Sequence, residues 1–536
     1  MIQRTAIAIL LLVPAAAGAQ EVPAARVDSV FARFQGAASP GCAVAVARGG
    51  EPVLARAYGM ASLEHDVPNT PETVFEAGSV SKQFTAAAVV LLARQGTLKL
   101  DDEVRRYIPE LPDYGTPITI RHLLNHTSGL RDWGTVVDIA GWPRGSRVHT
   151  HAHVLDVVSR QKSLNFAPGS EYLYSNTGYN LLAILVERVS GESFAAFTRR
   201  NLFEPAGMMR TRWRDDYTEV VKGRAIAYDT ARGAFHSNMP FENVHGNGGL
   251  LTTVGDLLRW NDALANGTVG GRGLAGEMER RGVLTGGRRI PYAEGLIVDE
   301  YRGVPQVSHG GATAGYRAYL ARYPRQRVSV ALLCNTATAN PAALSNQVAD
   351  LFLAGHTRDP ESAPAVTLAP SALSARAGLY RSRRTGEPLR LAVRDGKLRS
   401  GSGSELVPLS ATRFRVGRGP TQIVFDDPSG PRLLAPDGDT IAFERVEEAT
   451  PSAPAELVGE YHSDEAEATY TVALEDGKLL LRRRPDVSVL LTPAYADAFT
   501  TPHGSLVRFT RDASGRVNGL SLGLGRVRDL RFARTR

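Results

Sequence analysis

Residues 75–82, FEAGSVSK, organise the fold and the chemistry predicted for this chain. Ser79 and Lys82 stand three residues apart at the start of the apolar segment 83–93, QFTAAAVVLLA. Positions i and i+3 of a helix share one face, so the two side chains are expected to point the same way. The sequence therefore predicts a buried helix that begins with a serine beside a lysine.

This pair supplies the parts of a nucleophilic site. A serine hydroxyl is a weak nucleophile until a neighbouring base takes its proton. A lysine can be that base where burial or a nearby cation lowers its pKa, and a helix N-terminus favours a developing anion. Ser159 and Lys162 repeat the spacing without this context. The assignment to Ser79 and Lys82 therefore depends on the motifs that accompany them.

Length and composition exclude some classes of protein. The chain has 536 residues, too many for one compact domain, and its 43% hydrophobic and 22% charged residues are ordinary for a soluble globular protein. The net charge of +7 is modest for this length, and no Lys/Arg block is interleaved with aromatic residues. A nucleic-acid partner is therefore not expected.

Residues 1–19 have the layout of a signal peptide. Arg4 precedes an apolar run at 6–13, and the small residues AGA at 17–19 form a cleavage motif. The apolar run is too short to span a bilayer, and no later stretch is long enough. The mature protein is expected to be exported, either periplasmic or secreted, without a transmembrane segment.

Residues 20–354 are predicted to form one domain with strands at both ends and helices in the middle. This order indicates a mainly antiparallel sheet with an inserted helical subdomain, an α/β (α+β) fold class. The expected strands are 41–48, 52–59, 289–298, 304–311, 315–323 and 327–334.

All-β modules are predicted at 375–446 and 457–536, after linkers at 355–374 and 447–456 that are rich in Pro, Ala, Ser or Glu.

The two modules are predicted to be copies of each other. The tripeptide GLY at 378 recurs as GEY at 459, and DGKL at 395 recurs at 476, so both offsets are 81 residues. Short strands and turns without helix signals predict a small antiparallel barrel or half-barrel for each copy.

Cys42 and Cys334 lie in two of the expected strands. Each could be a small buried hydrophobe. Export also permits a disulfide between them if the two strands are neighbours.

Two other patterns are interpreted as having no catalytic role. His149, His151 and His153 alternate like metal ligands, but no second ligand cluster accompanies them. They are expected in the exposed first turn of a helix that Thr150 caps and that runs to about residue 162. Ser521 fits G-x-S-x-G, a motif that requires a helix after the serine, and none is predicted there.

Further motifs accompany Ser79 and Lys82 in chain order. They are HTSGL at 126–130, YSN at 174–176 after Pro168-Gly169, and HGG at 309–311. Together they resemble the serine β-lactamase and penicillin-binding-protein superfamily, in particular its branch of class C β-lactamases, D-aminopeptidases and related esterases. The resemblance covers roughly residues 25–354. The two appended β modules are also similar to the D-aminopeptidase layout.

The resemblance implies a role for each motif residue. Ser79 would attack a carbonyl and form an acyl-enzyme, and Lys82 would help to deprotonate it. Tyr174, as a phenolate or a hydrogen-bonded phenol, would pass the proton to the leaving group and later activate water. Its pKa of about 10 must fall for this, and flanking cations such as Lys82 could lower it. Asn176 would bind the substrate or Lys82. Backbone N–H groups of Ser79 and Ala312 would form the oxyanion hole.

The third motif departs from the antibiotic-binding members, which carry a lysine where His309 stands. A histidine is neutral much of the time at pH 7, so it argues against an efficient penicillinase and suits esterases and D-aminopeptidases. Gly310 and Gly311 would let the backbone approach the substrate. Alternatively, Ser79 is only a helix cap, residues 174–176 are an ordinary turn, and His309, like His126, is structural.

We therefore expect a serine hydrolase that cleaves amide or ester bonds in a small-molecule or short-peptide substrate, without a metal or an organic cofactor. The alternatives are a penicillin-recognising β-lactamase or D,D-carboxypeptidase, and an inactive binding protein that uses its β modules. The sequence leaves open whether these modules cover the cleft, form an oligomer interface or bind substrate. It does not fix the oligomeric state.

Overall fold

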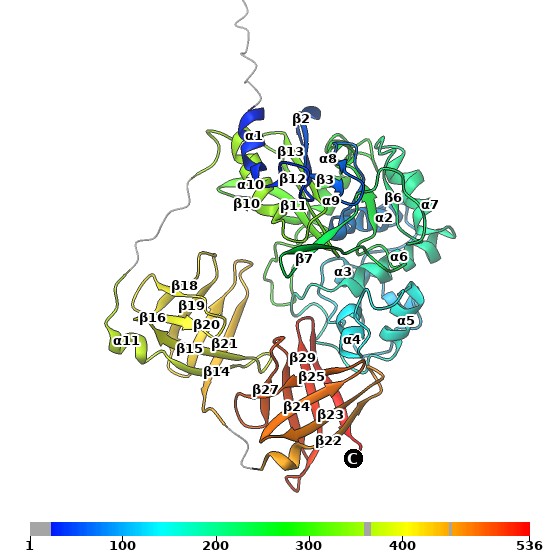
Figure 1. The fold of residues 1–536 in the computed structure, drawn as a ribbon. Helices are drawn as coiled ribbons and strands as arrows, with labels where there is room; N and C mark the ends of the chain where they lie inside the picture. The colour runs from blue at the N-terminus through cyan, green and yellow to red at the C-terminus, as the bar shows by residue number, and fades with distance from the viewer. Residues whose placement is uncertain (1–22, 359–365, 450–452) are drawn as a thin grey trace, which may run out of the picture.

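The computed structural model describes residues 23–358, 366–449 and 453–536 (Figure 1). A region of mixed helices and strands is followed by two all-β modules, which confirms the predicted fold class. The predicted signal peptide, residues 1–19, lies outside the described residues, and the linker boundaries stay predictions. No helix within the described ranges is long and apolar enough to cross a membrane.

A six-stranded antiparallel sheet forms the centre of the first region and is assembled from both ends of it, as predicted. The expected strand at 289–298 is wrong, since β10 begins only at Ile297. Pro291 lacks an N–H for a ladder hydrogen bond and Gly295 has a φ of +74°, so the extended run is interrupted. In sheet order the strands are β10 (Ile297–Tyr301), β11 (Val304–Thr313), β12 (Tyr316–Tyr323), β13 (Val328–Cys334), β1 (Cys42–Arg48) and β2 (Glu51–Tyr58).

Helices cover both faces of this sheet, and the side chains of β1 alternate between them. Val44 and Val46 pack in the cluster with α1 (Ala24–Val30) and α10 (Pro341–Phe352). Ala43, Ala45 and Ala47, which alternate with these valines, face α8 (Val254–Asn266), and their small side chains allow this helix to approach closely.

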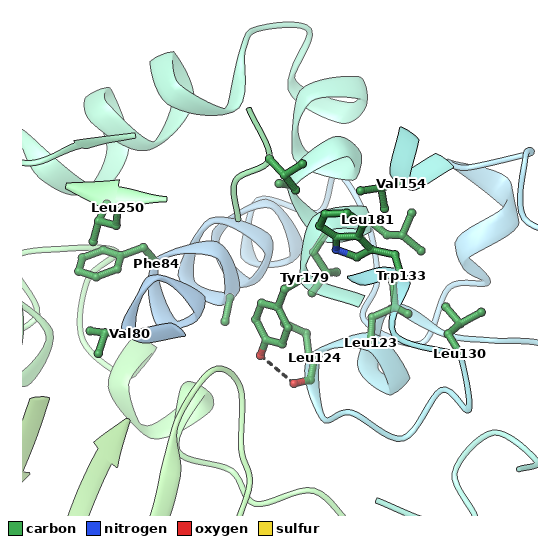
Figure 2. Packing of buried hydrophobic residues seen from close by; sticks show 14 of the residues in the cluster. Val80, Phe84, Leu123, Leu124, Leu130, Trp133, Val154, Tyr179, Leu181 and Leu250 are labelled. Carbon is green, nitrogen blue, oxygen red and sulfur yellow. Dashed lines mark hydrogen bonds between the residues drawn. The ribbon is translucent and has the colours of Figure 1, made fainter. Parts of the chain in front are cut away.

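The helical part of the first region is built around α2 (Lys82–Arg94) and α6 (Asn176–Ser190), which pack on each other. Phe84 of α2 and Tyr179 of α6 are fully buried in this core, and the Tyr179 hydroxyl donates to Leu124 O at 2.8 Å (Figure 2). The other helices are α3 (Ile120–Leu124), α4 (Trp133–Ile139), α5 (His151–Ser159), α7 (Phe194–Thr198) and α9 (Leu274–Met278). The short strands are β3 (Met60–Ser62), β4 (Val67–Pro68), β5 (Phe75–Glu76), β6 (Arg212–Trp213), β7 (Tyr228–Ala231), β8 (Ala234–Ser237) and β9 (Leu250–Thr252).

Each β module is one antiparallel sheet in which the first strand pairs with the last. A short helix, α11 (Pro370–Ser374), lies in the segment predicted as the first linker. The first module contains β14 (Gly378–Ser382), β15 (Pro388–Arg394), β16 (Lys397–Ser400), β17 (Leu406–Pro408), β18 (Arg413–Val416), β19 (Gln422–Asp427), β20 (Gly430–Leu434) and β21 (Thr440–Val446). The second contains β22 (Gly459–Ser463), β23 (Ala468–Glu475), β24 (Lys478–Arg483), β25 (Val487–Leu490), β26 (Thr492–Pro493), β27 (Ala498–Thr500), β28 (Leu506–Arg511), β29 (Val517–Leu524) and β30 (Val527–Arg534).

The predicted duplication of the modules is confirmed at the level of single contacts. The Tyr380 hydroxyl donates to Arg376 O at 2.9 Å, and the Tyr461 hydroxyl donates to Leu457 O at 2.7 Å. Both bonds run four residues back along the chain, and the two copies lie 81 residues apart. The first strand of each module also begins at the equivalent glycine, at 378 and 459.

The second module is docked on the helical part of the first region (Figure 1). The Arg131 and Glu465 side chains, 1% and 8% exposed, form an ion pair at 2.6 Å across the contact. The Tyr470 hydroxyl donates to Ile139 O at 2.9 Å, and the apolar core is continuous across the boundary. A charge pair buried in this way is costly to separate, so the contact holds the module in a fixed position.

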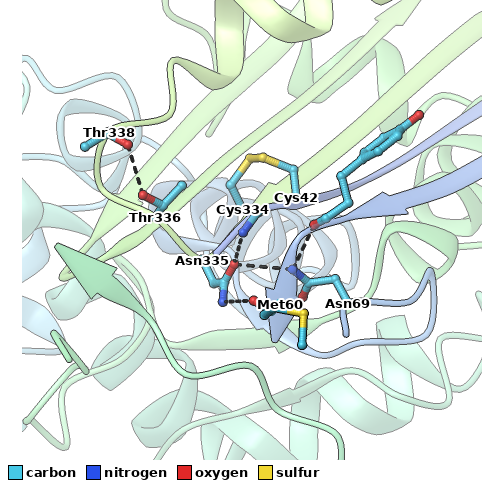
Figure 3. Close-up of a disulfide and its surroundings, with 9 residues drawn as sticks. Cys42, Met60, Asn69, Cys334, Asn335, Thr336 and Thr338 are labelled. Atoms are coloured by element: carbon cyan, nitrogen blue, oxygen red, sulfur yellow. Dashed lines mark hydrogen bonds between the residues drawn. A yellow bond between two sulfur atoms is a disulfide. The ribbon is translucent and has the colours of Figure 1, made fainter. Parts of the chain in front are cut away.

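Cys42 and Cys334 form a disulfide between the neighbouring strands β1 and β13 (Figure 3). Asn335, the next residue, is fully buried, accepts from Gly41 N at 2.8 Å and donates to Met60 O at 3.0 Å. The end of the central sheet is therefore fixed by a covalent bond and by buried hydrogen bonds.

Replacing both Cys42 and Cys334 with alanine is expected to lower the free energy of unfolding by about 2–4 kcal/mol, because the disulfide closes a long loop in the unfolded chain. The two cysteines are 292 residues apart. Urea denaturation with and without a reductant measures the effect. The reductant should lower the midpoint of the wild-type protein alone. An unchanged wild-type midpoint after complete reduction would contradict this prediction.

Candidate active site

Ser79 lies in the 3₁₀ turn Gly78–Ser81, which joins β5 to α2. Gly78 has a φ of +52°, and a Cβ built there would lie 2.7 Å from Ala312 N. Glycine is required because the turn packs directly against the backbone of β11. The helix predicted from residue 79 onward is regular α-helix only from Lys82.

Lys82 lies under Ser79 and is completely buried. Its Nζ is 3.1 Å from Ser79 Oγ, 2.9 Å from Asn176 Oδ1 and 2.6 Å from Asn247 O. Burial lowers the Lys82 pKa well below its usual value, and the positive charge of Arg526 lowers it further.

These contacts suit a neutral amine at Lys82. A neutral amine has two N–H groups and one lone pair. The carbonyl oxygens of Asn176 and Asn247 accept the two N–H groups, which leaves the lone pair for the Ser79 hydroxyl. The arrangement can therefore draw the proton from Ser79.

Tyr174 packs against Lys82, whose Nζ lies 4.8 Å from the centre of the ring. Burial raises the Tyr174 pKa, although the Ser79 hydroxyl and Arg526 act in the opposite direction. The expected net fall of this pKa is wrong: cations act to lower it, but the loss of solvation outweighs them. Tyr174 is a neutral phenol in this structure.

His126 holds the segment that carries Tyr174. The His126 ring lies 4.2 Å from the Tyr174 ring, and its Nδ1 accepts from Ser175 N at 3.2 Å. Its own φ is +57°, and burial lowers its pKa well below the usual range. A neutral, packed histidine fits the structural role expected for it.

The HGG motif lies on β11. Burial and the charge of Lys82 lower the pKa of His309 to about 3, so the ring is neutral. Its Nδ1 donates to Gly310 O at 2.6 Å, and its Nε2 accepts from the Tyr292 hydroxyl at 3.0 Å. His309 therefore does not supply a cation at this position of the cleft.

Gly311 lets β11 approach the Ser79 turn. A Cβ at this position would lie 2.0 Å from Ala77 O and 3.1 Å from Ser79 N. Together with the close approach of Gly78 to Ala312 N, this places the backbone N–H groups of Ser79 and Ala312 on adjoining segments. That is the arrangement required of the predicted oxyanion hole.

A cleft of about 720 Å³ joins these parts. Lys82 lies beneath it. Its lining includes the predicted residues Ser79, Tyr174, Asn176, His309, Gly310, Gly311 and Ala312, together with Arg144, Asn247, Tyr292, Arg317 and Arg526.

Comparison of the sequence with protein families agrees with this geometry. Residues 27–354, more than half of the chain, match the family described as Beta-lactamase. The chain belongs to the beta-lactamase family. A protein named D-aminopeptidase from Brucella canis is 29% identical over 525 residues, which cover 92% of this chain and 96% of that protein.

Solved structures of the beta-lactamase fold show the same architecture. The octameric penicillin-binding protein homologue from Pyrococcus abyssi has a TM-score of 0.57 and 23% identity, covering 87% of this chain and 99% of that chain. The D-amino acid amidase from Ochrobactrum anthropi SV3, solved with L-phenylalanine, has a TM-score of 0.52 and 23% identity, covering 62% of this chain and 98% of that chain. These similarities support the fold assignment.

Sequence reasoning missed Asn247, whose backbone carbonyl contacts Lys82. Asn247 lies in the turn GNGG, residues 246–249, where Gly246 and Gly249 have positive φ. The Asn180 side chain fixes this turn by donating to Asn247 Oδ1 at 2.7 Å. The sequence predicts the glycine-rich turn, but it does not show that the turn lies next to Lys82.

Arg526 was also missed, since it belongs to the second β module. Its guanidinium lies 4.7 Å from the centre of the Tyr174 ring and 3.5 Å from Asp132 Oδ2. No local motif marks Arg526, because only the docking of the module brings it to the cleft.

The second S-x-x-K sequence, at 159–162, and the G-x-S-x-G sequence around Ser521 lie away from the cleft. Lys162 is exposed and pairs with Asp464 at 2.7 Å, while Ser159 ends α5. Ser521 is a buried residue of β29, which turns into β30 without a helix. Neither serine has the neighbours of Ser79.

The three alternating histidines are only partly as expected. Thr150 caps α5 through a capping box with His153, but the helix ends at Ser159. The expected exposed position is wrong for all three histidines. His149 is fully buried against Trp133, because it precedes the cap and faces the core, and His151 and His153 are half-buried. Among the described residues, no His, Cys, Asp and Glu side chains form a group able to hold a metal ion.

Proposed function

We propose that this member of the beta-lactamase family is a serine hydrolase that cleaves amide or ester bonds through an acyl-enzyme on Ser79. The contact of Lys82 Nζ with Ser79 Oγ at 3.1 Å carries this proposal. The lysine is buried, and its lowered pKa favours the neutral amine, the form that can accept a proton.

Acylation begins when Ser79 Oγ attacks the substrate carbonyl and its proton passes to Lys82 Nζ. The carbonyl oxygen becomes an oxyanion that accepts from the backbone N–H groups of Ser79 and Ala312. The carbon–leaving-group bond then breaks and the acyl-enzyme remains.

Tyr174 completes the proton transfer. As a neutral phenol it can donate its proton to the departing nitrogen or oxygen and recover one from the Lys82 ammonium. Water then attacks the ester on Ser79 by the reverse order of proton transfers. Asn176 orients Lys82 through Oδ1, and its own N–H donates to Asp132 at 2.7 Å.

We propose short peptides, amides or esters as substrates, D-residues included. The relative from Brucella canis named D-aminopeptidase, which aligns over almost its whole length, supports this class. Because His309 is neutral, it offers no cation of its own to the carboxylate that penicillins carry. His309 and Gly310 are proposed to border the bound substrate.

We also propose that the protein is exported. The layout of residues 1–19 supports this, and so does the Cys42–Cys334 disulfide, since disulfides persist mainly in oxidising compartments.

Intact-protein mass spectrometry after incubation with a fluorophosphonate tests the nucleophile, and benzylpenicillin is tested in parallel. We expect a fluorophosphonate adduct that Ser79→Ala abolishes and Ser159→Ala, in the second S-x-x-K sequence, retains. A penicilloyl adduct on Ser79 would favour a penicillin-recognising enzyme. Folded protein that gives no adduct with either reagent would refute the serine hydrolase.

A further inference from the structure

We propose that Arg526, supplied by the second β module, binds a carboxylate on the leaving group of the substrate. This rests on the proposed function, and it specifies the substrate: the leaving group carries a free carboxylate.

The hairpin that carries Arg526 is fixed to the first region. Arg526 lies in the tight turn between β29 and β30, beside Gly525, whose φ is +53°. Asn165 clamps this turn, since its Nδ2 donates to Arg526 O at 3.0 Å and its Oδ1 accepts from Arg528 N at 2.8 Å. The backbone that carries Arg526 is therefore held in place at the cleft, which lowers the entropic cost of binding.

The same hairpin is anchored behind the turn. The Arg528 guanidinium donates to Glu171 Oε2 at 2.9 Å, and its backbone carbonyl accepts from the buried Arg131 at 3.0 Å. These bonds join the hairpin to the segment that leads to Tyr174. These hydrogen bonds therefore fix the position of the Arg526 backbone relative to the first region.

The Arg526 side chain has hydrogen-bond donors to spare. In the described part of the chain, its single hydrogen bond is the long one to Asp132 Oδ2 at 3.5 Å. Asp132 is 4% exposed and already accepts from Asn176 N and Thr135 N. Since a guanidinium has five N–H groups and Arg526 is 40% exposed, a planar carboxylate can bind it from the cleft.

The charge of the cleft favours an anion. Its lining contains three arginines, Arg144, Arg317 and Arg526, and no Asp or Glu among the described residues. Arg144 is paired with Glu242 behind the surface, and His309 is neutral. A substrate ammonium would find no carboxylate partner here, whereas a substrate carboxylate finds Arg526.

Tyr174 fixes the side of the substrate on which the carboxylate lies. The Arg526 guanidinium packs over the ring of Tyr174, the residue proposed to protonate the leaving group. A carboxylate held by Arg526 is therefore nearer to the leaving group than to the acyl group on Ser79.

Three acetate esters of one size test this: 3-carboxyphenyl, 3-carbamoylphenyl and 3-(aminomethyl)phenyl acetate. Each kcat/KM is divided by the rate of hydroxide hydrolysis of the same ester, and assays are run on the alkaline plateau, because Arg526 also lowers the Lys82 pKa. We expect the wild-type enzyme to prefer the carboxylate ester. Arg526→Met should lower that preference about 10- to 100-fold, mainly through KM, as for a lost charge-assisted hydrogen bond.

Two further variants sharpen the result. Arg526→Lys should keep part of the preference. Arg531→Met, on β30 of the same module with its side chain 81% exposed, should keep all of it.

This inference alone is overturned if Ser79 is labelled but the enzyme does not prefer the carboxylate ester. It is also overturned if the preference survives Arg526→Met. No hydrolysis of any ester together with no labelling of Ser79 overturns the proposed function itself.

Discussion

Lys82→Met is expected to reduce kcat/KM by roughly 10²- to 10⁴-fold, the usual contribution of a general base. Methionine fits the buried volume but cannot take the proton from Ser79, which lies 3.1 Å from Lys82 Nζ. The loss should appear in kcat as well as in kcat/KM, because the proton moves only in the transition state. Steady-state kinetics with an activated ester measures it.

Lys162→Met is the matched control, because Lys162 occupies the same position in the second S-x-x-K sequence. Its side chain is 65% exposed and donates to Asp464 at 2.7 Å, away from the cleft, so the variant should keep the wild-type kcat/KM. Equal losses in both variants, or full activity of Lys82→Met, would refute the role of Lys82 as the base.

The wild-type pH profile follows from the same lysine. Activity should fall as the pH drops through the lowered pKa of Lys82, because the ammonium form cannot accept a proton. Arg526→Met should move this acid limb of kcat/KM to higher pH, since the positive charge of Arg526 is one cause of the lowering. An acid limb that moves to lower pH would contradict the assigned electrostatics.

The lowered pKa of Lys82 also predicts how the stability of the fold changes with pH. Below a pH of about 10.4 the unfolded chain protonates Lys82, whereas the folded chain stays neutral down to its lowered pKa. The wild-type free energy of unfolding therefore decreases as the pH is lowered through that window. The Lys82→Met variant lacks this dependence. Denaturant unfolding across pH should show the variant gaining stability relative to wild type as the pH falls.

Much of the site could be predicted because its chemistry is carried by short motifs. Ser79 and Lys82 are neighbours through helical spacing alone, and Tyr174 and His309 were recognised within their own motifs. The structure brings these residues to one cleft. The site residues can be recognised from local sequence because each motif also forms a turn or the edge of a strand.

What could not be predicted depends on distant packing. Arg526 reaches the cleft through the docking of a module whose sequence carries no site motif, and the partner of Cys42 lies 292 residues away. The Tyr174 pKa was misjudged for the same reason. The nearby cation was visible in the motif, but the degree of burial, which dominates, is set by the whole fold.

Gly311→Ala is expected to reduce kcat/KM by about 100- to 1000-fold, the cost of losing one oxyanion-hole donor. The new Cβ would lie 2.0 Å from Ala77 O, 3.0 Å from Ala77 C and 3.1 Å from Ser79 N. All three are backbone atoms, so no side chain can turn away, and β11 must separate from the Ser79 turn. The oxyanion donors of Ser79 and Ala312 then no longer converge on one point.

Gly310→Ala is the matched control, one residue earlier on the same strand. Its Cβ would meet the Tyr319 ring at 3.6 Å, an ordinary contact, so a clearly smaller loss of kcat/KM is expected. Fluorophosphonate labelling rates and urea midpoints separate a displaced oxyanion hole from an unfolded protein. A folded Gly311→Ala variant with the activity of Gly310→Ala would show that the separation of β11 from the turn does not matter. Ser79 N and Ala312 N would then have to be replaced as the proposed oxyanion donors.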